Sequence, residues 1–532
     1  MTDIINQPQL VSLCLALIGE KFKLSPAEIA LARRTPAVRS PRIIGKCRDA
    51  IRACRDPLGE AFTSLRSPEV RRPLGATYTP APIDQAMLLW ASRQVTPARI
   101  VDPGAGSGRF LLSAAAAFPK AQLVGVEIDP LAALTMRANL AACGLEKRSK
   151  VEVIDYRAFP LPKLDGPTLF IGNPPYVRHH DIAADAKEWY GRVALSYGIK
   201  ASKLAGLHLH FFLRTLQLAA DGDVGCFITS AEWLDVNYGE ALRRLLATEL
   251  GGTDLTVIDP KAVTFTDAAT TSAITGFRIR RRAPALRVRT VATAAELAKA
   301  TETKQVPWAV LEKSPRWSII IKPHAAPPSG HVELGELCRV HRGQVTGSNE
   351  LWIAGAHSVG LPSRFLLPTV TRARELLDAG DVLDDVRHLK RVIDLPVDLD
   401  ELLSHEREPV LRFLRWAEKN GGKESYIAKH RRAWWAVRLK EPAPILCTYM
   451  ARRPPAFVRN PRNVRHINIA HGLYPREPLA SEILDALASW LRSKVLTAQG
   501  RTYAGGLTKF EPKEVERLTI PAPHMFTNGA FS

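Results

Sequence analysis

The stretch "ARIVDPGAGSGRFLLSAAAAF" (98–118) decides the fold of this chain. An apolar run of strand length begins at Ile100, a turn containing Gly104, Gly106 and Gly108 follows, and an alanine-rich helical segment comes next. Glycine lets the backbone turn tightly and lets a ligand approach without a Cβ in the way. This order predicts the first strand–loop–helix unit of an α/β sheet, with a ligand at the carboxyl end of the strand.

Apolar runs of strand length continue to alternate with helical segments after this unit. The next strand-like runs are "AQLVGVEID" (121–129), "KVEVID" (150–155), "PTLFIGNPP" (167–175) and "GDVGCFIT" (222–229), and "HLHFFLRTLQLAA" (208–220) is helix-like. Such alternation is typical of a parallel sheet covered by helices on both faces. The sequence therefore predicts a doubly wound α/β domain.

At 532 residues the chain exceeds what one hydrophobic core usually organises, so we expect more than one domain. Residues 1–70 have apolar positions at helical spacing and predict a helical N-terminal extension, and the α/β domain covers residues 71–285. The basic stretch "FRIRRRAPALRVRT" (277–290) ends the alternation. We expect a linker over 286–334 and a second, mixed domain over 335–532, whose fold does not follow from its pattern.

The chain is basic, with 73 Lys and Arg against 53 Asp and Glu and a formal net charge of +20. This charge favours a polyanionic partner, although a basic enzyme without such a partner fits it equally well. The 7 cysteines include no CxxC pair, which argues for a reducing compartment and against a disulfide framework or zinc site. The apolar stretch "LVSLCLALIG" (10–19) is too short to span a bilayer and lacks a basic flank. We therefore expect a cytoplasmic protein with no metal and no membrane contact.

Acidic residues end three successive predicted strands: Asp102, Glu127 and Asp155. Glu127 stands 19 residues after Gly108, where a carboxylate is suited to accept hydrogen bonds from both hydroxyls of a ribose. A glycine-rich loop alone would also suit a dinucleotide. No GxxxxGK[ST] phosphate loop is present, so a nucleoside with little phosphate is favoured over ATP.

Four segments occur in an order that resembles motifs I to IV of class I S-adenosylmethionine-dependent amino-methyltransferases: "DPGAGSGRF" (102–110), "GVEIDP" (125–130), "VIDY" (153–156) and "GNPPY" (172–176). Upstream, "GATYTP" (75–80) resembles their motif X. The resemblance implies the class I Rossmann-like fold and S-adenosyl-L-methionine as the cofactor. The cofactor-binding residues that it implies are Tyr78, Thr79, Pro80, Asp102, Gly104 and Gly106 at the methionine end, Glu127 at the ribose, and Ile128 and Asp155 at the adenine.

The NPPY segment ends an apolar strand with residues that cannot continue a ladder comfortably. An exocyclic amine of a base is a poor nucleophile because its lone pair is delocalised into the ring. The Asn173 side-chain carbonyl and the Pro174 main-chain carbonyl are suited to accept the amine hydrogens and to aim the lone pair at a methyl donor. Tyr176 is suited to stack on a base that has swung out of the duplex.

Two later segments narrow the resemblance to methyltransferases that act on DNA. "VTFTDAATTSAITGFRIRR" (263–281) resembles motif VIII of adenine-N6 methyltransferases, with Phe265 as the candidate second aromatic of the base sandwich, or alternatively a core residue. "VHRGQVTGSNELW" (340–352) resembles the opening of a DNA target-recognition domain. The order of these segments resembles that of gamma-class (TaqI-like) DNA adenine-N6 methyltransferases of restriction-modification systems, in which the cofactor motifs come first, NPPY second and the recognition domain last.

This resemblance implies methylation of the N6 amine of a flipped-out adenine in double-stranded DNA, by a monomer that protects the DNA from a partner restriction endonuclease. Methylation of RNA bases or of protein glutamine remains an alternative, as does a non-catalytic DNA-binding specificity protein. Arginines near Trp434, Trp435 and Tyr449 suit phosphate contacts, and we expect the two tryptophans to be core residues. These arginines are Arg431, Arg432, Arg452, Arg453, Arg459, Arg462 and Arg465.

Overall fold

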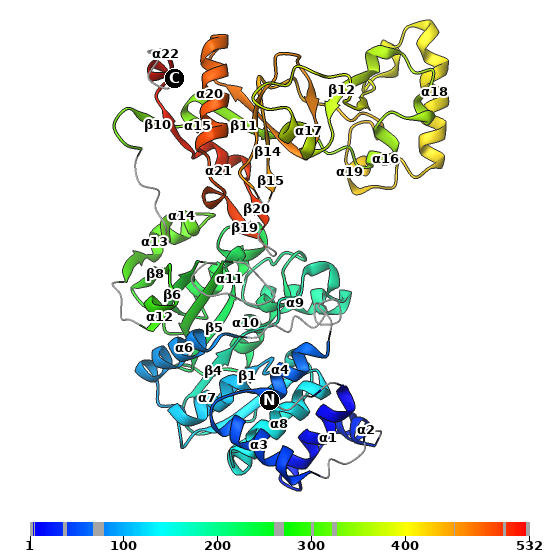
Figure 1. Ribbon diagram of the computed structural model, residues 1–532. Helices are drawn as coiled ribbons and strands as arrows, with labels where there is room; N and C mark the ends of the chain where they lie inside the picture. The colour runs from blue at the N-terminus through cyan, green and yellow to red at the C-terminus, as the bar shows by residue number, and fades with distance from the viewer. Residues whose placement is uncertain are drawn as a thin grey trace. The chain divides into compact units, whose positions relative to one another are not determined.

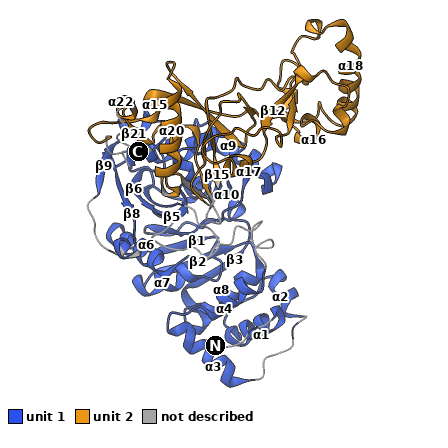
Figure 2. Ribbon diagram, turned by 45° about the horizontal axis from the view of Figure 1, so that its top comes forward, with its two compact units in different colours: residues 1–324 blue, residues 325–532 orange. Residues whose placement is uncertain are grey.

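The computed structural model describes residue 4, residues 6–33, residue 35, and residues 40–66, 79–259, 271–298, 303–321, 327–451, 453–503 and 507–527. The chain divides into two compact units, which Figure 2 shows in different colours. The first unit comprises residues 1–324 and the second residues 325–532.

The first unit is built around a nine-stranded sheet with strand order β3-β2-β1-β4-β5-β7-β6-β8-β9 (Figure 1). Parallel pairing joins the five strands from β3 to β5, and β7 runs antiparallel between β5 and β6. The strands are β1 (Arg99–Pro103), β2 (Gln122–Glu127), β3 (Ser149–Val153), β4 (Thr168–Gly172), β5 (Val224–Ser230), β6 (Gly252–Ile258), β7 (Ser272–Arg278), β8 (Ala285–Val291) and β9 (Lys304–Pro307). The predicted doubly wound α/β sheet is confirmed.

Helices cover both faces of this sheet. Along β1, Ile100 and Val101 enter two different hydrophobic clusters, which is the period-two pattern of a strand buried on both faces. The helices that pack around the sheet are α6 (Ala81–Gln94), α7 (Arg109–Ala117), α8 (Pro130–Ala142), α9 (Ala184–Ser196), α10 (Leu207–Leu218), α11 (Glu240–Ala247), α12 (Ala294–Ala298), α13 (Trp308–Glu312) and α14 (Ser318–Ile321).

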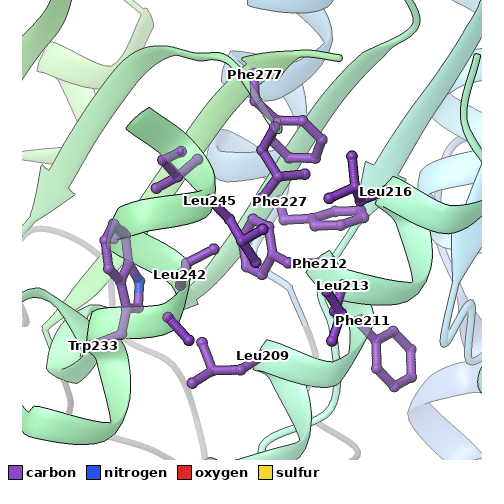
Figure 3. Close-up of a cluster of buried hydrophobic side chains, with 14 of the residues drawn as sticks. Leu209, Phe211, Phe212, Leu213, Leu216, Phe227, Trp233, Leu242, Leu245 and Phe277 are labelled. Carbon is purple, nitrogen blue, oxygen red and sulfur yellow. The ribbon is translucent and has the colours of Figure 1, made fainter. Parts of the chain in front are cut away.

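Helix α10 carries aromatic side chains for both the core and the edge of the sheet. Its Phe212 packs edge-on against Phe227 of β5, with 5.1 Å between ring centroids, and Phe277 of β7 packs on Phe227 at 5.6 Å. Figure 3 shows these rings gathered with leucines of α10 and α11, whereas Phe211 points away from them. Phe211 belongs to the same buried cluster and also lines a cavity at the sheet edge, so one helix links the core to that cavity.

Among the described N-terminal residues, four helices pack against α8 (Figure 1). Residues 131–142 of α8 are all buried, because the sheet covers one side of the helix and the N-terminal helices cover the other. This double burial explains why the sequence of α8 is apolar almost all round. The four helices are α1 (Gln7–Ile18), α2 (Pro26–Ala32), α3 (Pro41–Arg52) and α4 (Pro57–Ser64).

The expected linker over 286–334 contains ordered strands of the sheet. In β8, Leu286, Val288 and Val291 are buried, while Arg287 forms a bidentate ion pair with Asp254 of β6. The basic run therefore has a strand alternation in which arginines occupy the outward positions. The linker prediction is wrong for β8 and β9, and the sheet extends beyond the point at which we expected it to end.

The second unit combines a four-stranded antiparallel sheet, β11-β18-β14-β16, with smaller sheets of order β13-β12-β17, β15-β20-β19 and β10-β21. Its strands are β10 (His331–Glu333), β11 (Cys338–Arg342), β12 (Leu366–Val370), β13 (Arg391–Ile393), β14 (Ile445–Thr448), β15 (Met450–Ala451), β16 (Phe457–Arg459), β17 (Arg465–His466), β18 (Ala470–Pro475), β19 (Arg501–Tyr503), β20 (Leu507–Lys509) and β21 (Thr519–Pro521). Its helices are α15 (Leu334–Leu337), α16 (Asn349–Trp352), α17 (Ala373–Asp378), α18 (Ser404–Lys419), α19 (Tyr426–Lys429), α20 (Ser481–Lys494), α21 (Pro512–Glu516) and α22 (Pro523–Thr527).

Trp434 and Trp435 of the second unit are partly buried and pack against its core, as we expected. The Trp435 indole N–H donates to the carbonyl of Pro396 at 2.9 Å, and Trp434 packs edge-on against Trp352. Both border a cluster of buried aliphatic and aromatic side chains. Both side chains therefore support the fold of this unit at the border of its core.

Candidate active site

A cavity of about 350 Å³ lies at the carboxyl ends of β1, β2 and β4. The strand order reverses between β1 and β4, which is where ligands of open α/β sheets bind. The cavity is of the size that small-molecule sites have in proteins. The predicted residues that line it are Thr79, Gly104, Gly106, Glu127, Ile128, Asp155 and Asn173.

The glycine-rich loop forms one wall of the cavity. Gly104, Gly106 and Gly108 have φ values of +73°, +55° and +82°, in the left-handed region that favours glycine. A Cβ on Gly104 would lie 3.3 Å from Cδ of Pro175, so this loop approaches the NPPY segment closely. A Cβ on Gly106 would have no described atom within 4 Å, which leaves room for a ligand beside the loop.

Glu127 is held in place by backbone N–H groups. One carboxylate oxygen accepts from Gly106 N at 2.8 Å, and the other accepts from Ile128 N at 2.8 Å and Asp129 N at 2.9 Å. Burial raises the pKa of Glu127, and these backbone hydrogen bonds oppose the rise. The oxygen that faces Gly106 keeps a further lone pair, so it can accept from a ligand hydroxyl.

Ile128 and Asp155, the two predicted adenine-binding residues, differ in how freely their side chains can contact a ligand. The Ile128 side chain is 55% exposed and lines the cavity, so it offers an apolar surface to a ring. The Asp155 carboxylate accepts several hydrogen bonds from the Arg157 side chain and one from Arg157 N. Burial alone would raise the pKa of Asp155, but the bonds to Arg157 and its charge lower it. Asp155 is thus ionised and shares its acceptor capacity with Arg157.

Asp102 lies behind the glycine-rich loop, and the cavity wall that the described residues form does not include it. Burial, together with the charges of Glu127 and Asp84, raises its pKa well above the usual value. A Cβ on Gly172 would lie 2.4 Å from an Asp102 carboxyl oxygen, so a glycine at this position makes space for the buried carboxyl. The Asp102 carboxyl is therefore buried beside Gly172 at the end of β4.

The NPPY segment follows β4 directly. The Asn173 side-chain N–H₂ donates to the Thr79 hydroxyl at 3.0 Å, which turns the amide oxygen away from Thr79. Pro174 is buried, and Tyr176 is half-buried with its ring centroid 6.3 Å from that of His208. The structure thus brings Thr79, which precedes α6, next to Asn173. Tyr78, Phe265 and Arg452 lie outside the described residues.

Other residues of the site were not predicted. Gly59, Phe62 and Thr63 of α4 line the cavity, although the sequence of α4 shows only helical spacing. His208 of α10 packs beside Tyr176, and burial lowers its pKa to about 4, so this imidazole is neutral at physiological pH. No sequence signal distinguished His208 from an ordinary core residue.

Within the described part of the chain, no three His, Cys, Asp or Glu side chains come together as metal ligands. None of the helices among the described residues is both long and apolar enough to cross a membrane.

The cavity suits S-adenosylmethionine. It combines a fixed carboxylate at Glu127, an apolar side chain at Ile128 and open space beside Gly106, which match a ribose, an adenine ring and a substituent on the ribose. These residues come from the end of β2 and from the loop between β1 and α7.

The chain is similar to methyltransferases of restriction-modification systems. Residues 166–259 match the family described as Eco57I restriction-modification methylase, and residues 325–530 match the C-terminal domain of the type II methyltransferase M.Eco57I. The chain is 56% identical to the type II methyltransferase M.XamI of Xanthomonas campestris pv. amaranthicola, over 97% of this chain and 98% of that protein. It is 23% identical to the type II methyltransferase M.AccI of Acinetobacter calcoaceticus, over 86% of this chain and 87% of that one.

A solved structure shares the fold. The type IIL restriction-modification enzyme MmeI, solved in complex with DNA, superposes with a TM-score of 0.50 at 14% identity, over 90% of this chain and 75% of that one. The expected class I methyltransferase fold with a C-terminal domain is confirmed. The chain belongs to the type II methyltransferases of restriction-modification systems, which are DNA methyltransferases, and its methyl donor is S-adenosylmethionine.

Proposed function

We propose that this DNA methyltransferase modifies the N6 amine of adenine within a specific double-stranded sequence. The observation that carries the proposal is the placement of Asn173. Its amide lines the donor cavity, and the hydrogen bond to Thr79 fixes which way the carbonyl oxygen points. An acceptor held in this way, directly after a strand end, suits a planar exocyclic amine.

The residues of the NPPY segment prepare the amine. S-adenosylmethionine supplies a methyl group on a sulfonium, which keeps the electron pair of the carbon–sulfur bond when the methyl carbon bonds to a nucleophile. The Asn173 side-chain oxygen and the Pro174 carbonyl accept the two amine hydrogens, which favours a tetrahedral nitrogen with its lone pair available. The proline rings restrict φ, so both acceptors are in place before the base arrives.

The target adenine reaches this site by leaving the duplex, since its amine is inaccessible within a base stack. We assign Tyr176 and Phe265 to the two faces of the flipped base. On the donor side we assign Tyr78, Thr79, Pro80, Asp102, Gly104 and Gly106 to the methionine end. Glu127 binds the ribose, and Ile128 and Asp155 bind the adenine of the donor.

The second unit is the part that reads DNA sequence in this proposal. Arg432, Arg453 and Arg462 are exposed there and suit contacts to phosphate. Arg459 and Arg465, by contrast, form ion pairs with Asp485 and Glu441 and support the fold. We further propose that the protein acts as a monomer in the cytoplasm and protects host DNA from a partner restriction endonuclease.

Methyl-labelled S-adenosylmethionine tests the target. The purified protein is incubated separately with duplex DNA, RNA and cell protein, and the labelled products are digested to nucleosides or amino acids. We expect label in N6-methyldeoxyadenosine from duplex DNA. Label in N4-methyldeoxycytidine, in RNA or in protein glutamine would contradict the proposal.

Replacing Asn173 tests the mechanism. Because Asn173→Ala removes an acceptor for the amine, we expect turnover to fall by about 10²-fold or more while donor affinity changes little. Tyr176→Ala should also lower turnover, through weaker stacking on the flipped base. Asn237→Ala is the control, because Asn237 is exposed and lies outside the described cavity wall. Normal turnover by Asn173→Ala would refute the mechanism.

A further inference from the structure

Helix α4 precedes all the cofactor motifs in sequence but forms part of the same cavity. Phe62 and Thr63 line the cavity together with the glycine-rich loop. Phe62 is buried, and the Arg66 guanidinium lies over its ring at 4.7 Å from the centroid. The packing of α4 against α8 therefore brings an aromatic side chain to the wall of the cavity.

The residue before α4 connects the helix to the glycine-rich loop. Asp56 is buried, and its carboxylate accepts from the Ser107 hydroxyl at 2.5 Å, Gly59 N at 2.9 Å and the Asn139 side chain at 3.0 Å. The Asn139 N–H₂ also donates to the Ser107 carbonyl at 2.9 Å. Asp56 thus joins α4, α8 and the loop in one buried hydrogen-bond network.

Two further contacts bring α4 and the donor site together. A Cβ on Gly59 would lie 2.2 Å from an Asp56 carboxyl oxygen and 2.8 Å from the Ser107 hydroxyl, so only a glycine permits this approach. At the other end of α4, Arg66 forms an ion pair with Asp129, whose backbone N–H donates to Glu127. Both ends of the helix are therefore tied to the segments that carry Gly106 and Glu127.

We propose that α4 is a wall of the methyl-donor site, in which Phe62 and Thr63 contact bound S-adenosylmethionine. In this role, Asp56 is a positioning residue that holds the glycine-rich loop in the conformation that binds the donor. The inference rests on the use of S-adenosylmethionine and is independent of the target base. The N-terminal helices are accordingly part of the donor site as well as a support for α8.

The first test compares two phenylalanines of the N-terminal helical region. Phe62→Leu and Phe22→Leu each remove an aromatic ring that an arginine covers, but among the described residues only Phe62 of the two lines the cavity. Calorimetric titration of S-adenosylmethionine into the full-length protein without DNA measures donor affinity, and thermal unfolding without ligand checks that each variant is folded. We expect Phe62→Leu to weaken donor binding by about three- to tenfold, and Phe22→Leu to leave it unchanged. Equal affinities for both folded variants would overturn the assignment of Phe62.

The second test asks whether Asp56 acts through its hydrogen bonds to the glycine-rich loop or through its negative charge. Asp56→Ala removes the acceptor for Ser107, Gly59 and Asn139, so we expect donor affinity to fall by about tenfold or more. Asp56→Asn keeps an oxygen for Gly59 and Asn139 and offers N–H₂ to the Ser107 hydroxyl, so it should restore most of the affinity. Asp49→Ala, at an exposed position of α3, is the control. Unchanged affinity in folded Asp56→Ala, or equal losses in the Ala and Asn variants, would overturn the positioning role.

Discussion

Replacing Glu127 with glutamine should weaken the donor site in two measurable ways. The carboxylate accepts from Gly106 N on one oxygen and from Ile128 N and Asp129 N on the other, whereas an amide offers one oxygen. If that oxygen stays with the two later N–H groups, the Gly106 N–H faces an amide N–H₂ and loses its acceptor. A buried donor without its partner costs about 1–3 kcal/mol, so the glycine-rich loop should be less stable in the variant.

The same substitution removes one of the acceptors that we assign to the ribose hydroxyls. A hydrogen bond to a charged group contributes about 1.5–3 kcal/mol, so the dissociation constant for S-adenosylmethionine should rise by about 10- to 150-fold. The assay is calorimetric titration of the donor without DNA. Glu152→Gln is a matched control, because Glu152 is a half-buried carboxylate of the adjacent strand β3 and lies outside the described cavity wall.

A donor analogue that lacks a ribose hydroxyl makes the test specific to Glu127. The wild-type protein should bind S-adenosylhomocysteine more tightly than its 2′-deoxy or 3′-deoxy analogue, because the carboxylate loses a partner in each analogue. The Glu127→Gln variant should discriminate much less, and the difference between the two comparisons gives the coupling energy of the pair. Equal discrimination by the variant and the wild-type protein would show that Glu127 does not bind the ribose.

Two further predictions concern stability and DNA binding. Burial raises the pKa of Asp84 to about 6 against an ordinary value near 3.8, so in the folded protein it stays protonated while the unfolded chain ionises. The free energy of unfolding should therefore fall by about 3 kcal/mol as pH rises from about 4 to 6. Denaturant unfolding at several pH values measures this fall, and Asp84→Asn should remove the contribution of Asp84. An unchanged pH dependence in Asp84→Asn would contradict the prediction. Replacing Arg432, Arg453 and Arg462 together with glutamine should reduce the slope of log K against log salt by up to about 3 in DNA-binding titrations, because about one counterion is released per phosphate contact. The matched control replaces Arg374 and Arg387, which are exposed but ion-paired with Asp378 and Asp385, and an equal reduction there would contradict the assignment.

The part of the fold that the sequence predicts is the part in which local pattern and three-dimensional position coincide. Strands β1, β4 and β5 are apolar runs whose burial on both faces gives an unambiguous signal. The sequence did not predict strand β8, because arginines within an apolar run argue against a strand of the sheet. In the structure, Asp254 of β6 compensates the charge of Arg287. Pairing of this kind depends on register, which a single sequence does not contain.

The residues of the site likewise divide into those whose position follows from the sequence and those whose position does not. Predicted site residues next to glycines or prolines at strand ends line the cavity because the backbone alone brings them there, as at Gly106 and Asn173. Whether a carboxylate faces the ligand depends on its neighbours instead. Asp155 is engaged by Arg157, and the Asp102 carboxyl is buried beside Gly172, and neither fact follows from the order of motifs. Helix α4 has no motif at all, so its place at the cavity could be found only in three dimensions.

The glycine-rich loop is the element at which these separate contributions meet. Gly104 approaches Pro175 of the NPPY segment, Gly106 donates to Glu127, and Ser107 donates to Asp56 before α4. Each contact joins the loop to a different segment of the chain, so a displacement of the loop alters its contacts with the NPPY segment, with Glu127 and with Asp56 together. Residues in one contact network act non-additively, because loss of one partner alters the position of the others. In the proposed function, an ordered loop is therefore needed to position the donor next to the accepting amine. We assign the ordering of the loop to the buried hydrogen-bond network of Asp56, which lies directly before α4 and outside every cofactor motif.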